Sequence, residues 1–400
     1  MMLNQDTLRE ATRLTQAGQL TEATTLLQRM FRGERAPAVA SAVPGRTCLP
    51  ECAPPTIDQE ASDVSEADRV APAEGPTAVP QRRRPLFDRA KDGTWLGLRG
   101  VKRSPASITA IVPQGAMFIE GTYGNKAGYR TYKLFVPSGY HQGQPLPLVV
   151  MLHGCSQSPD DFAAGTKMNF IAEEQTCLVV YPAQRSDANP SKCWNWFRSA
   201  DQRRDEGEPS LIAGITRQVM HDYSVDPKRI FVAGLSAGGA AAATMGATYR
   251  DLYAAVGIHS GLAYGAATDM PSAFAAMRQG GGAIRQTVSD GPPIRAIIFH
   301  GDRDTTVHPD NSAQAMEQII GTTRTRKKVH RGQIPGGHGY TRTIYANGER
   351  EILEHWNIHG AGHAWSGGST AGSYTDTEGP DATKEMLRFF LESSRPQHPH

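Results

Sequence analysis

Five short apolar runs limit what this chain can fold into more than any other feature of its sequence. They occupy residues 148–152, 178–181, 230–233, 255–259 and 294–299, the last interrupted only by Arg295. Each run has the length of a strand, and near-continuous apolar runs are typical of strands that are covered on both faces. The runs therefore predict the central strands of a mostly parallel sheet.

Helical patterns alternate with these runs. They cover residues 161–174, 211–223, 237–249 and 311–320, and residues 381–391 have the pattern of a closing helix. Alternation at Tyr132, Leu134 and Val136 predicts an early, half-exposed strand, and residues 350–358 also have a strand pattern. This order predicts an α/β domain over residues 96–393, with helices flanking the sheet and a flexible tail over residues 394–400.

The N-terminal region has a different composition. Apolar positions within residues 3–31, divided by Gly18, predict a small helical hairpin over residues 1–33. Nine prolines and no aromatic residue fall between residues 34 and 85, so we expect a disordered linker over residues 34–95. Cys48 and Cys52 lie in this linker without a second Cys or His pair nearby, and are interpreted as linker thiols rather than metal ligands.

Charge and hydropathy exclude several classes of protein. The net charge is +2 and the only basic block is residues 82–84, so nucleic acid is not an expected partner. No apolar stretch approaches the roughly 18 residues of a membrane span. The first thirty residues lack the apolar run of a secretory signal, so we expect a cytoplasmic location and leave an extracellular one open. The five cysteines are too scattered to indicate a disulfide scaffold.

One motif carries the strongest chemical signal, because it follows the run at residues 230–233 and opens an Ala-rich helical pattern. Its sequence is Gly234-Leu235-Ser236-Ala237-Gly238. A serine on a sharp strand-to-helix turn takes a strained backbone conformation, and the two glycines leave room for that turn. A Gly-rich turn with a capping serine has the same letters. Strand, turn and helix all fall where a nucleophile requires them, so we predict that Ser236 is a nucleophile.

A serine nucleophile needs an imidazole base and a carboxylate that orients the base, in the chain order Ser, acid, His. The run at residues 294–299 leads into a loop with two carboxylates, Asp302 and Asp304. Asp304 is the preferred acid, since Asp302 lies nearer the strand end and can accept hydrogen bonds within the turn. For the base we predict His363, which lies in a Gly-rich loop able to fold back over the nucleophile.

Two further histidines, His355 and His359, precede His363. His355 falls inside a strand pattern and is interpreted as structural, whereas His359 caps the loop or lines the pocket. No carboxylate or cysteine lies at ligand spacing beside the three, so neither a metal nor a cofactor is predicted.

Acyl transfer also requires donors for the oxyanion that develops in the transition state. The run at residues 148–152 ends in His153-Gly154-Cys155-Ser156. In a nucleophile-elbow fold this position supplies one backbone N–H, and the residue after the nucleophile supplies the other. The candidate donors are therefore Cys155 and Ala237. The Cys155 thiol is either unpaired or bridged to Cys193, because the sequence does not give their separation.

At this point the chain resembles a known family of esterases, the polyhydroxybutyrate depolymerases, which are related to bacterial and fungal feruloyl and acetylxylan esterases. Five ordered segments between about residues 121 and 391 carry the resemblance: Leu152-His153-Gly154-Cys155-Ser156-Gln157, Cys193-Trp194-Asn195-Trp196-Phe197, Gly234-Leu235-Ser236-Ala237-Gly238-Gly239, His300-Gly301-Asp302-Arg303-Asp304 and Gly362-His363-Ala364-Trp365. The resemblance implies an α/β-hydrolase fold, a triad of Ser236, Asp304 and His363, and an oxyanion donor near Cys155. The N-terminal hairpin and linker resemble the unsecreted branch of the family.

The predicted function is that of a serine carboxylic ester hydrolase which forms an acyl-enzyme and acts on short-chain hydroxyalkanoate esters or oligomers. A feruloyl or acetylxylan esterase is the alternative. A second alternative is a protein that binds polyester granules or a partner through residues 3–31 and uses the hydrolase domain as a scaffold. Trp194, Trp196 and Trp365 are candidates for an apolar substrate surface because they lie in loops, although the first two also fit buried loop anchors.

Overall fold

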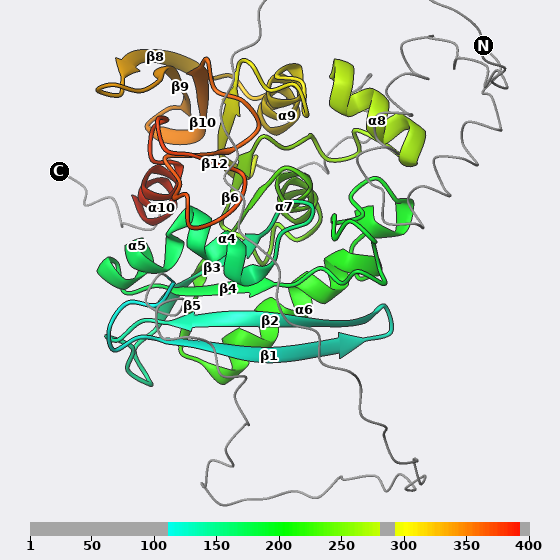
Figure 1. Cartoon of the computed structure of the whole chain (residues 1–400), viewed down its shortest axis with the longest axis vertical. Coiled ribbons are helices and arrows are strands. Elements are labelled where there is room, and N and C mark those ends of the chain that lie inside the picture. The colour runs from blue at the N-terminus through cyan, green and yellow to red at the C-terminus, as the bar shows by residue number, and fades with distance from the viewer. Residues whose placement is uncertain (1–110, 281–292, 393–400) are drawn as a thin grey trace, which may run out of the picture. The chain divides into compact units, whose positions relative to one another are not determined.

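A computed structural model describes residues 111–280 and 293–392 of the chain (Figure 1). The predicted hairpin over residues 1–33, the linker over residues 34–95 and the tail over residues 394–400 lie outside these described residues, as do Cys48 and Cys52.

In the described residues the dominant element is a ten-stranded sheet with the strand order β1-β2-β4-β3-β5-β6-β7-β10-β9-β8. The strands are β1 (Met117–Asn125), β2 (Gly128–Val136), β3 (Leu146–Leu152), β4 (Leu178–Pro182), β5 (Val225–Leu235), β6 (Ala255–His259), β7 (Arg295–Gly301), β8 (Arg326–Gln333), β9 (Gly339–Asn347) and β10 (Arg350–His359). From β4 to β10 the neighbours pair in parallel, and antiparallel pairs extend the sheet at both ends. The predicted mostly parallel sheet is confirmed.

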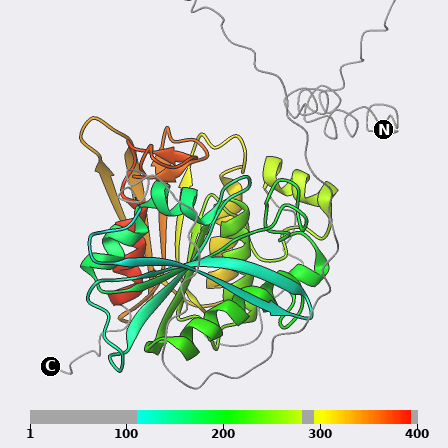
Figure 2. The ribbon, with the colours of Figure 1, turned by 60° about the horizontal axis from the view of Figure 1, so that its bottom comes forward.

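Helices cover both faces of this sheet. They are α4 (Pro159–Thr166), α5 (Met168–Glu174), α6 (Gly207–Asp222), α7 (Ala237–Thr248), α8 (Met270–Gln279), α9 (Asp310–Ile320) and α10 (Ala382–Glu392). Helices α4, α5 and α10 pack on one face and α6, α7 and α9 on the other (Figures 1 and 2). Because side chains alternate along a strand, Val149 joins one core and Val150 the other, and both are fully buried. This double burial explains the continuous apolar runs.

One predicted helix is wrong in extent: residues 161–174 form two helices, α4 and α5, instead of one. The break is at Lys167, whose φ of 55° is left-handed and whose N–H donates to the carbonyl of Ala163 at 3.1 Å. A distant loop ends α4, since the Ser369 N–H donates to the carbonyl of Gly165 at 2.7 Å. That loop is not visible in the local pattern.

The strand order changes direction between β3 and β5. The chain leaves β3 toward β4 on one side, then returns to β5 and continues toward β6 on the other. Ligands of open parallel sheets bind outside the carboxyl ends of strands at such a switch of direction. The loops that follow β3 and β5 are therefore the expected position of a binding or catalytic site. Among the described helices none is both long and apolar enough to cross a membrane.

Candidate active site

Ser236 is the single residue between the end of β5 at Leu235 and the start of α7 at Ala237. Its φ of 58° lies in a region that residues other than glycine rarely adopt, and such strain is concentrated at functional sites. A Cβ at Gly234 would overlap the carbonyl of Gly238, and a Cβ at Gly238 would overlap that of Leu152. Both glycines are thus required for the helix to start this close to β5 and β3. The predicted strand–turn–helix geometry is confirmed.

The predicted base and acid are in contact. His363 Nδ1 lies 2.7 Å from Asp304 Oδ2, and the Asp304 side chain is completely buried. The other oxygen, Oδ1, accepts the N–H groups of Thr306 at 2.9 Å and Val307 at 2.8 Å. Burial alone would raise the pKa of Asp304, yet hydrogen bonds from His300 and His363 hold that pKa well below its usual range. Asp304 is therefore a carboxylate at neutral pH, able to orient the imidazole and stabilise its protonated form.

The competing carboxylate has a different partner. Asp302 Oδ2 lies 3.0 Å from His359 Nδ1, and Asp302 Oδ1 accepts the N–H of Gly360 at 2.7 Å. The side chain of Asp302 is 36% exposed, whereas that of Asp304 is 0% exposed. Asp302 and His359 therefore close the start of the loop that carries His363, and Asp302 does not share the imidazole of His363.

Hydrogen bonds between strand ends align the nucleophile turn with the acid and base loops. The N–H of Ser236 donates to the carbonyl of His259 at 2.9 Å, and the N–H of Ser260 donates to that of Phe299 at 2.9 Å. Within the described residues the Ser236 hydroxyl makes no hydrogen bond with His363. Such contacts often tighten only when substrate is bound. The acid and the base are thus in contact in the structure, whereas the Ser236 hydroxyl is not hydrogen-bonded to the base.

Two backbone N–H groups beside Ser236 are unoccupied. Gly154 and Ser156 both use their N–H groups, on Gln157 Oε1 at 2.9 Å and on the carbonyl of Ser191 at 2.6 Å. Between them, the N–H of Cys155 has no protein acceptor in the described part of the chain, and the same is true of Ala237 at the start of α7. These are the two predicted oxyanion donors. Because these two N–H groups have no acceptor in the described residues and the start of α7 carries a partial positive charge, they can stabilise a negatively charged oxygen.

Of the two alternatives for the Cys155 thiol, unpaired or bridged to Cys193, the structure shows the disulfide with Cys193. The bridge connects the segment after β3 to a loop 38 residues later in the chain. Cys177, the remaining cysteine of the described residues, is free and buried in the core.

The three candidate tryptophans are buried. Trp194 is fully buried and its indole N–H donates to the carbonyl of His153 at 3.1 Å. Trp196 is 6% exposed, and Trp365 is 1% exposed with its indole N–H on Thr383 Oγ1 at 2.9 Å. The expectation that Trp365 contacts substrate is therefore wrong: after His363 the chain turns inward and places the ring in the core. Trp194 is a loop anchor.

Sequence reasoning assigned no role to His259, which supports the base loop. Its ring is fully buried and stacks on Trp365 and Phe299 with centroids 5.0 and 5.7 Å apart. His259 Nε2 accepts the N–H of Ser366 at 3.0 Å, and burial lowers the pKa of His259 to about 3, so the ring is neutral. Its position at the end of β6, on the same sheet edge as Ser236, was the available signal.

Tyr374 was also missed. Its side chain is 49% exposed, its φ is 53°, and its hydroxyl lies 3.2 Å from Ser156 Oγ. An exposed aromatic ring in a strained backbone conformation therefore stands beside the oxyanion segment. The two residues are 218 positions apart in the chain, so no local pattern connects them. In residues 111–280 and 293–392, no cluster of His, Cys, Asp and Glu is arranged to hold a metal ion.

A strained serine at the switch point of a parallel sheet, together with a histidine held by a buried aspartate, defines the α/β-hydrolase class. Within that class, residues 130–325 match the model of the family described as Esterase PHB depolymerase.

Individual relatives agree with this assignment. Poly(3-hydroxyalkanoate) depolymerase C of Paucimonas lemoignei is 34% identical over 251 residues, which are 60% of this chain and 60% of that protein. Feruloyl esterase B of Thermothelomyces thermophilus is 26% identical over 236 residues, or 54% of this chain and 78% of that protein. The solved acetyl xylan esterase of Aspergillus awamori has the same fold, with a TM-score of 0.52 at 20% identity over 62% of this chain and 93% of that one. The chain thus spans less than two thirds of the Paucimonas protein.

Proposed function

We propose that this chain is a serine carboxylic ester hydrolase that forms an acyl-enzyme on Ser236. The observation that carries the proposal is the 2.7 Å contact between His363 and the buried carboxylate of Asp304, on the sheet edge where the turn of Ser236 ends β5. An imidazole held by a buried carboxylate is the arrangement that a serine needs to lose its proton during attack.

In the first half-reaction, Ser236 Oγ attacks the ester carbonyl carbon and its proton passes to His363 Nε2. The carbonyl oxygen becomes an oxyanion and accepts hydrogen bonds from the N–H groups of Cys155 and Ala237. When the intermediate collapses, the bond to the alcohol oxygen breaks and His363 returns the proton to that oxygen. The alcohol leaves, and the acyl group stays on Ser236.

In the second half-reaction, water attacks the acyl carbon and gives its proton to His363. Collapse breaks the bond to Ser236 Oγ, which takes the proton back, and the carboxylic acid is released. Asp304 stays ionised throughout, because hydrogen bonds from His300 and His363 keep its pKa low. Its charge stabilises the imidazolium that forms twice in the cycle.

The substrates we favour are short-chain hydroxyalkanoate esters or oligomers. The family description and the 34% identity to a poly(3-hydroxyalkanoate) depolymerase support this class. Feruloyl and acetylxylan esters remain the alternative, supported by relatives with those names at 26% and 25% identity. Turnover of hydroxybutyrate oligomers, methyl ferulate and acetylated xylan by one preparation separates the classes. Higher kcat/KM on either of the last two would overturn the hydroxyalkanoate proposal.

The disulfide bears on where this chemistry takes place. Disulfides persist in oxidising compartments and are rare where thiols are kept reduced, so the Cys155–Cys193 bridge supports an extracellular or periplasmic site over a cytoplasmic one. Mass spectrometry of unreduced native protein checks this, and two free thiols would contradict it.

Granule binding through residues 3–31 is a separate proposal, because these residues lie outside the described part of the chain. Deletion of residues 1–33, followed by a granule co-sedimentation assay, tests it.

Fluorophosphonate labelling tests the nucleophile directly. The reagent should label Ser236 in the wild-type protein, as shown by peptide mapping, and should not label Ser236→Ala. The same variant should lose hydrolysis of a short-chain nitrophenyl ester by about 10⁵-fold to 10⁶-fold. Retained hydrolysis in correctly folded Ser236→Ala would refute the proposed function.

A further inference from the structure

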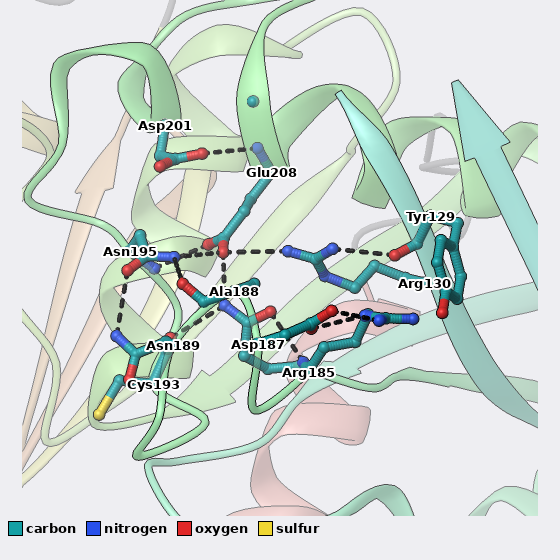
Figure 3. A network of polar contacts seen from close by, with 12 residues as sticks. Tyr129, Arg130, Arg185, Asp187, Ala188, Asn189, Cys193, Asn195, Asp201 and Glu208 are labelled. Atoms are coloured by element: carbon teal, nitrogen blue, oxygen red, sulfur yellow. Dashed lines mark hydrogen bonds and ion pairs between the residues drawn. The ribbon is translucent and has the colours of Figure 1, made fainter. Parts of the chain in front are cut away.

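A buried carboxylate outside the triad is bound to the loop that faces the oxyanion segment. Glu208, in the first turn of α6, is 5% exposed. It accepts the backbone N–H and the side-chain amide of Asn195, both at 2.7 Å, and a guanidinium nitrogen of Arg130 at 3.3 Å. The side-chain amide of Gln184 donates to it as well. Figure 3 shows Arg130, from β2, and Asn195, from the loop between β4 and α6, pointing toward Glu208.

The partners define the charge of Glu208. Burial and the nearby carboxylate of Asp201 raise its pKa, whereas the Asn195 N–H, the Gln184 amide and Arg130 act in the opposite direction. The amide orientations are set by other contacts, because Asn195 Oδ1 accepts from Asn189 and Gln184 Oε1 accepts the N–H of Arg185. Every group that is hydrogen-bonded to the Glu208 carboxylate is therefore a donor. An ionised carboxylate, which only accepts, matches this set.

Two routes lead from Glu208 to the segment after β3. The first runs through Gln184, whose N–H donates to His153 Nε2 at 3.0 Å and whose amide also donates to the carbonyl of Cys193 at 2.9 Å. Cys193 in turn is bonded covalently to Cys155. Through Gln184, Glu208 is thus linked to His153, two residues before the oxyanion donor Cys155, and to Cys193, the disulfide partner of Cys155.

The second route runs through Asn195. Its Oδ1 accepts from Asn189 Nδ2 at 3.0 Å, and Asn189 Oδ1 accepts the N–H of Ser191 at 3.0 Å. The carbonyl of Ser191 then accepts the N–H of Ser156 at 2.6 Å. This last bond occupies the N–H of Ser156, whereas the N–H of Cys155 has no protein acceptor in the described residues. Each step is a direct hydrogen bond; Asn195 and Asn189 are buried, whereas Ser191 and Ser156 are exposed.

We propose that Glu208 is a positioning residue which, through Gln184 and Asn195, holds the 183–198 loop so that the N–H of Cys155 points at the oxyanion. The inference rests on the proposed function, since it needs an oxyanion in that place. A buried ion is a poor source of stability, because a hydrophobic group of similar volume often does as well. A fully satisfied polar network does, however, specify one geometry, which is what an oxyanion donor requires.

The test compares two buried glutamates. Glu208→Gln turns an amide N–H₂ toward donors and breaks the network. Glu354→Gln is the matched control, because Glu354 is also a fully buried carboxylate. It lies in β10, where it is bound by Arg342 of β9, by Arg388 of α10 and by Trp356, and it does not contact the 183–198 loop. Glu208→Gln should lower kcat about 10-fold to 100-fold with KM within about twofold, since an oxyanion donor acts in the transition state. Glu354→Gln should keep kcat within about twofold while its melting temperature falls.

A second variant keeps the inference testable if Glu208→Gln does not fold. Asn189→Ala interrupts the Asn195 route and leaves the contacts of Glu208 in place. It should lower kcat about 3-fold to 10-fold, and the double variant should be no slower than Glu208→Gln alone, because both act on one chain of contacts. Wild-type kcat in Asn189→Ala, or losses that multiply in the double variant, would contradict the relay.

Ser236→Ala, measured beside these variants, separates the two proposals. If Ser236→Ala stays active, the proposed function fails and this inference with it. If Ser236→Ala is inactive while Glu208→Gln keeps the wild-type kcat, only the role of Glu208 is overturned. The same holds if Glu208→Gln and Glu354→Gln lose kcat equally at equal loss of melting temperature, or if Glu208→Gln changes KM alone.

Discussion

The two sides of the Ser236 turn are held by different means. On the side of the base, the loop that carries His363 is fixed by stacking of His259 on Trp365 and by hydrogen bonds to Asp302 and Asp304. On the oxyanion side, a disulfide joins Cys155 to a loop that is itself bound to a buried carboxylate. The first side is non-covalent throughout, whereas the second is cross-linked.

The difference matches what each side has to do. The base accepts a proton from Ser236 and later from water, and it donates a proton to the alcohol oxygen and later to Ser236 Oγ. Its ring must therefore form hydrogen bonds to different oxygen atoms in turn. An oxyanion donor acts only if it already points at the place where charge develops. The structure therefore places its covalent link beside the group that must stay still. Four experiments test whether the two sides differ in this way.

The largest effect is expected at the acid on the base side. Asp304→Asn removes the charge that orients His363 and should lower kcat by about 10⁴-fold with little change in KM. Asp302→Asn, the matched control, leaves the His363–Asp304 contact intact and should cost less than about 10-fold. Steady-state kinetics on a nitrophenyl ester measures both. A larger loss in Asp302→Asn than in Asp304→Asn would reverse the assignment of the acid.

Removal of the cross-link tests the oxyanion side. The double variant Cys155→Ala/Cys193→Ala should lose about 2–4 kcal/mol of unfolding free energy, because the bridge closes a 38-residue loop. Its kcat should fall about 10-fold, since the Cys155 N–H is then held by hydrogen bonds alone. Chemical denaturation and kinetics give the two numbers. Cys177→Ala, which removes a buried thiol away from the bridge, should change stability without changing kcat.

Acid should weaken both sides through one buried histidine each. Burial lowers the pKa of His153 on the oxyanion side to about 4 and that of His259 on the base side to about 3. The unfolded chain binds these protons near pH 6.5, so stability should be complete above that pH and fall as the pH drops toward 4. Each histidine removes up to about 1.4 kcal/mol of unfolding free energy per pH unit.

Substitution at either histidine checks the origin of that slope. His153→Gln and His259→Gln should each be less stable than wild type at pH 7 and should each show a shallower loss between pH 6.5 and 4. Denaturation midpoints at several pH values provide the comparison. An unchanged slope in both variants would assign the acid sensitivity to other groups.

The smallest effect is expected at Tyr374, which lies at the exposed edge of the oxyanion side. Tyr374→Ala removes the ring and should raise KM about 3-fold to 10-fold for esters with an apolar acyl or aryl group. Tyr374→Phe loses only the hydroxyl contact with Ser156 and should stay within about twofold of wild type, because an exposed hydrogen bond contributes little. Equal kinetics for all three proteins would remove Tyr374 from the substrate surface.

Local patterns were enough to predict much of this domain. Strand-length apolar runs predicted the central strands, because burial on both faces leaves no room for polar alternation. The Gly234–Gly238 motif predicted the turn, because only glycine allows a helix to begin so close to two strands. The choice of Asp304 over Asp302 also came from the sequence, and the contact with His363 agrees with it.

Other features depend on residues far apart in the chain, and they can be seen only in the folded domain. The Cys155–Cys193 bridge, the inward turn of Trp365, the place of Tyr374 beside Ser156 and the network of Glu208 all join segments with unrelated local patterns. A sequence shows that a residue is aromatic, acidic or a thiol. Which neighbours it meets depends on how strands order themselves in the sheet, and that order follows from packing of the whole domain.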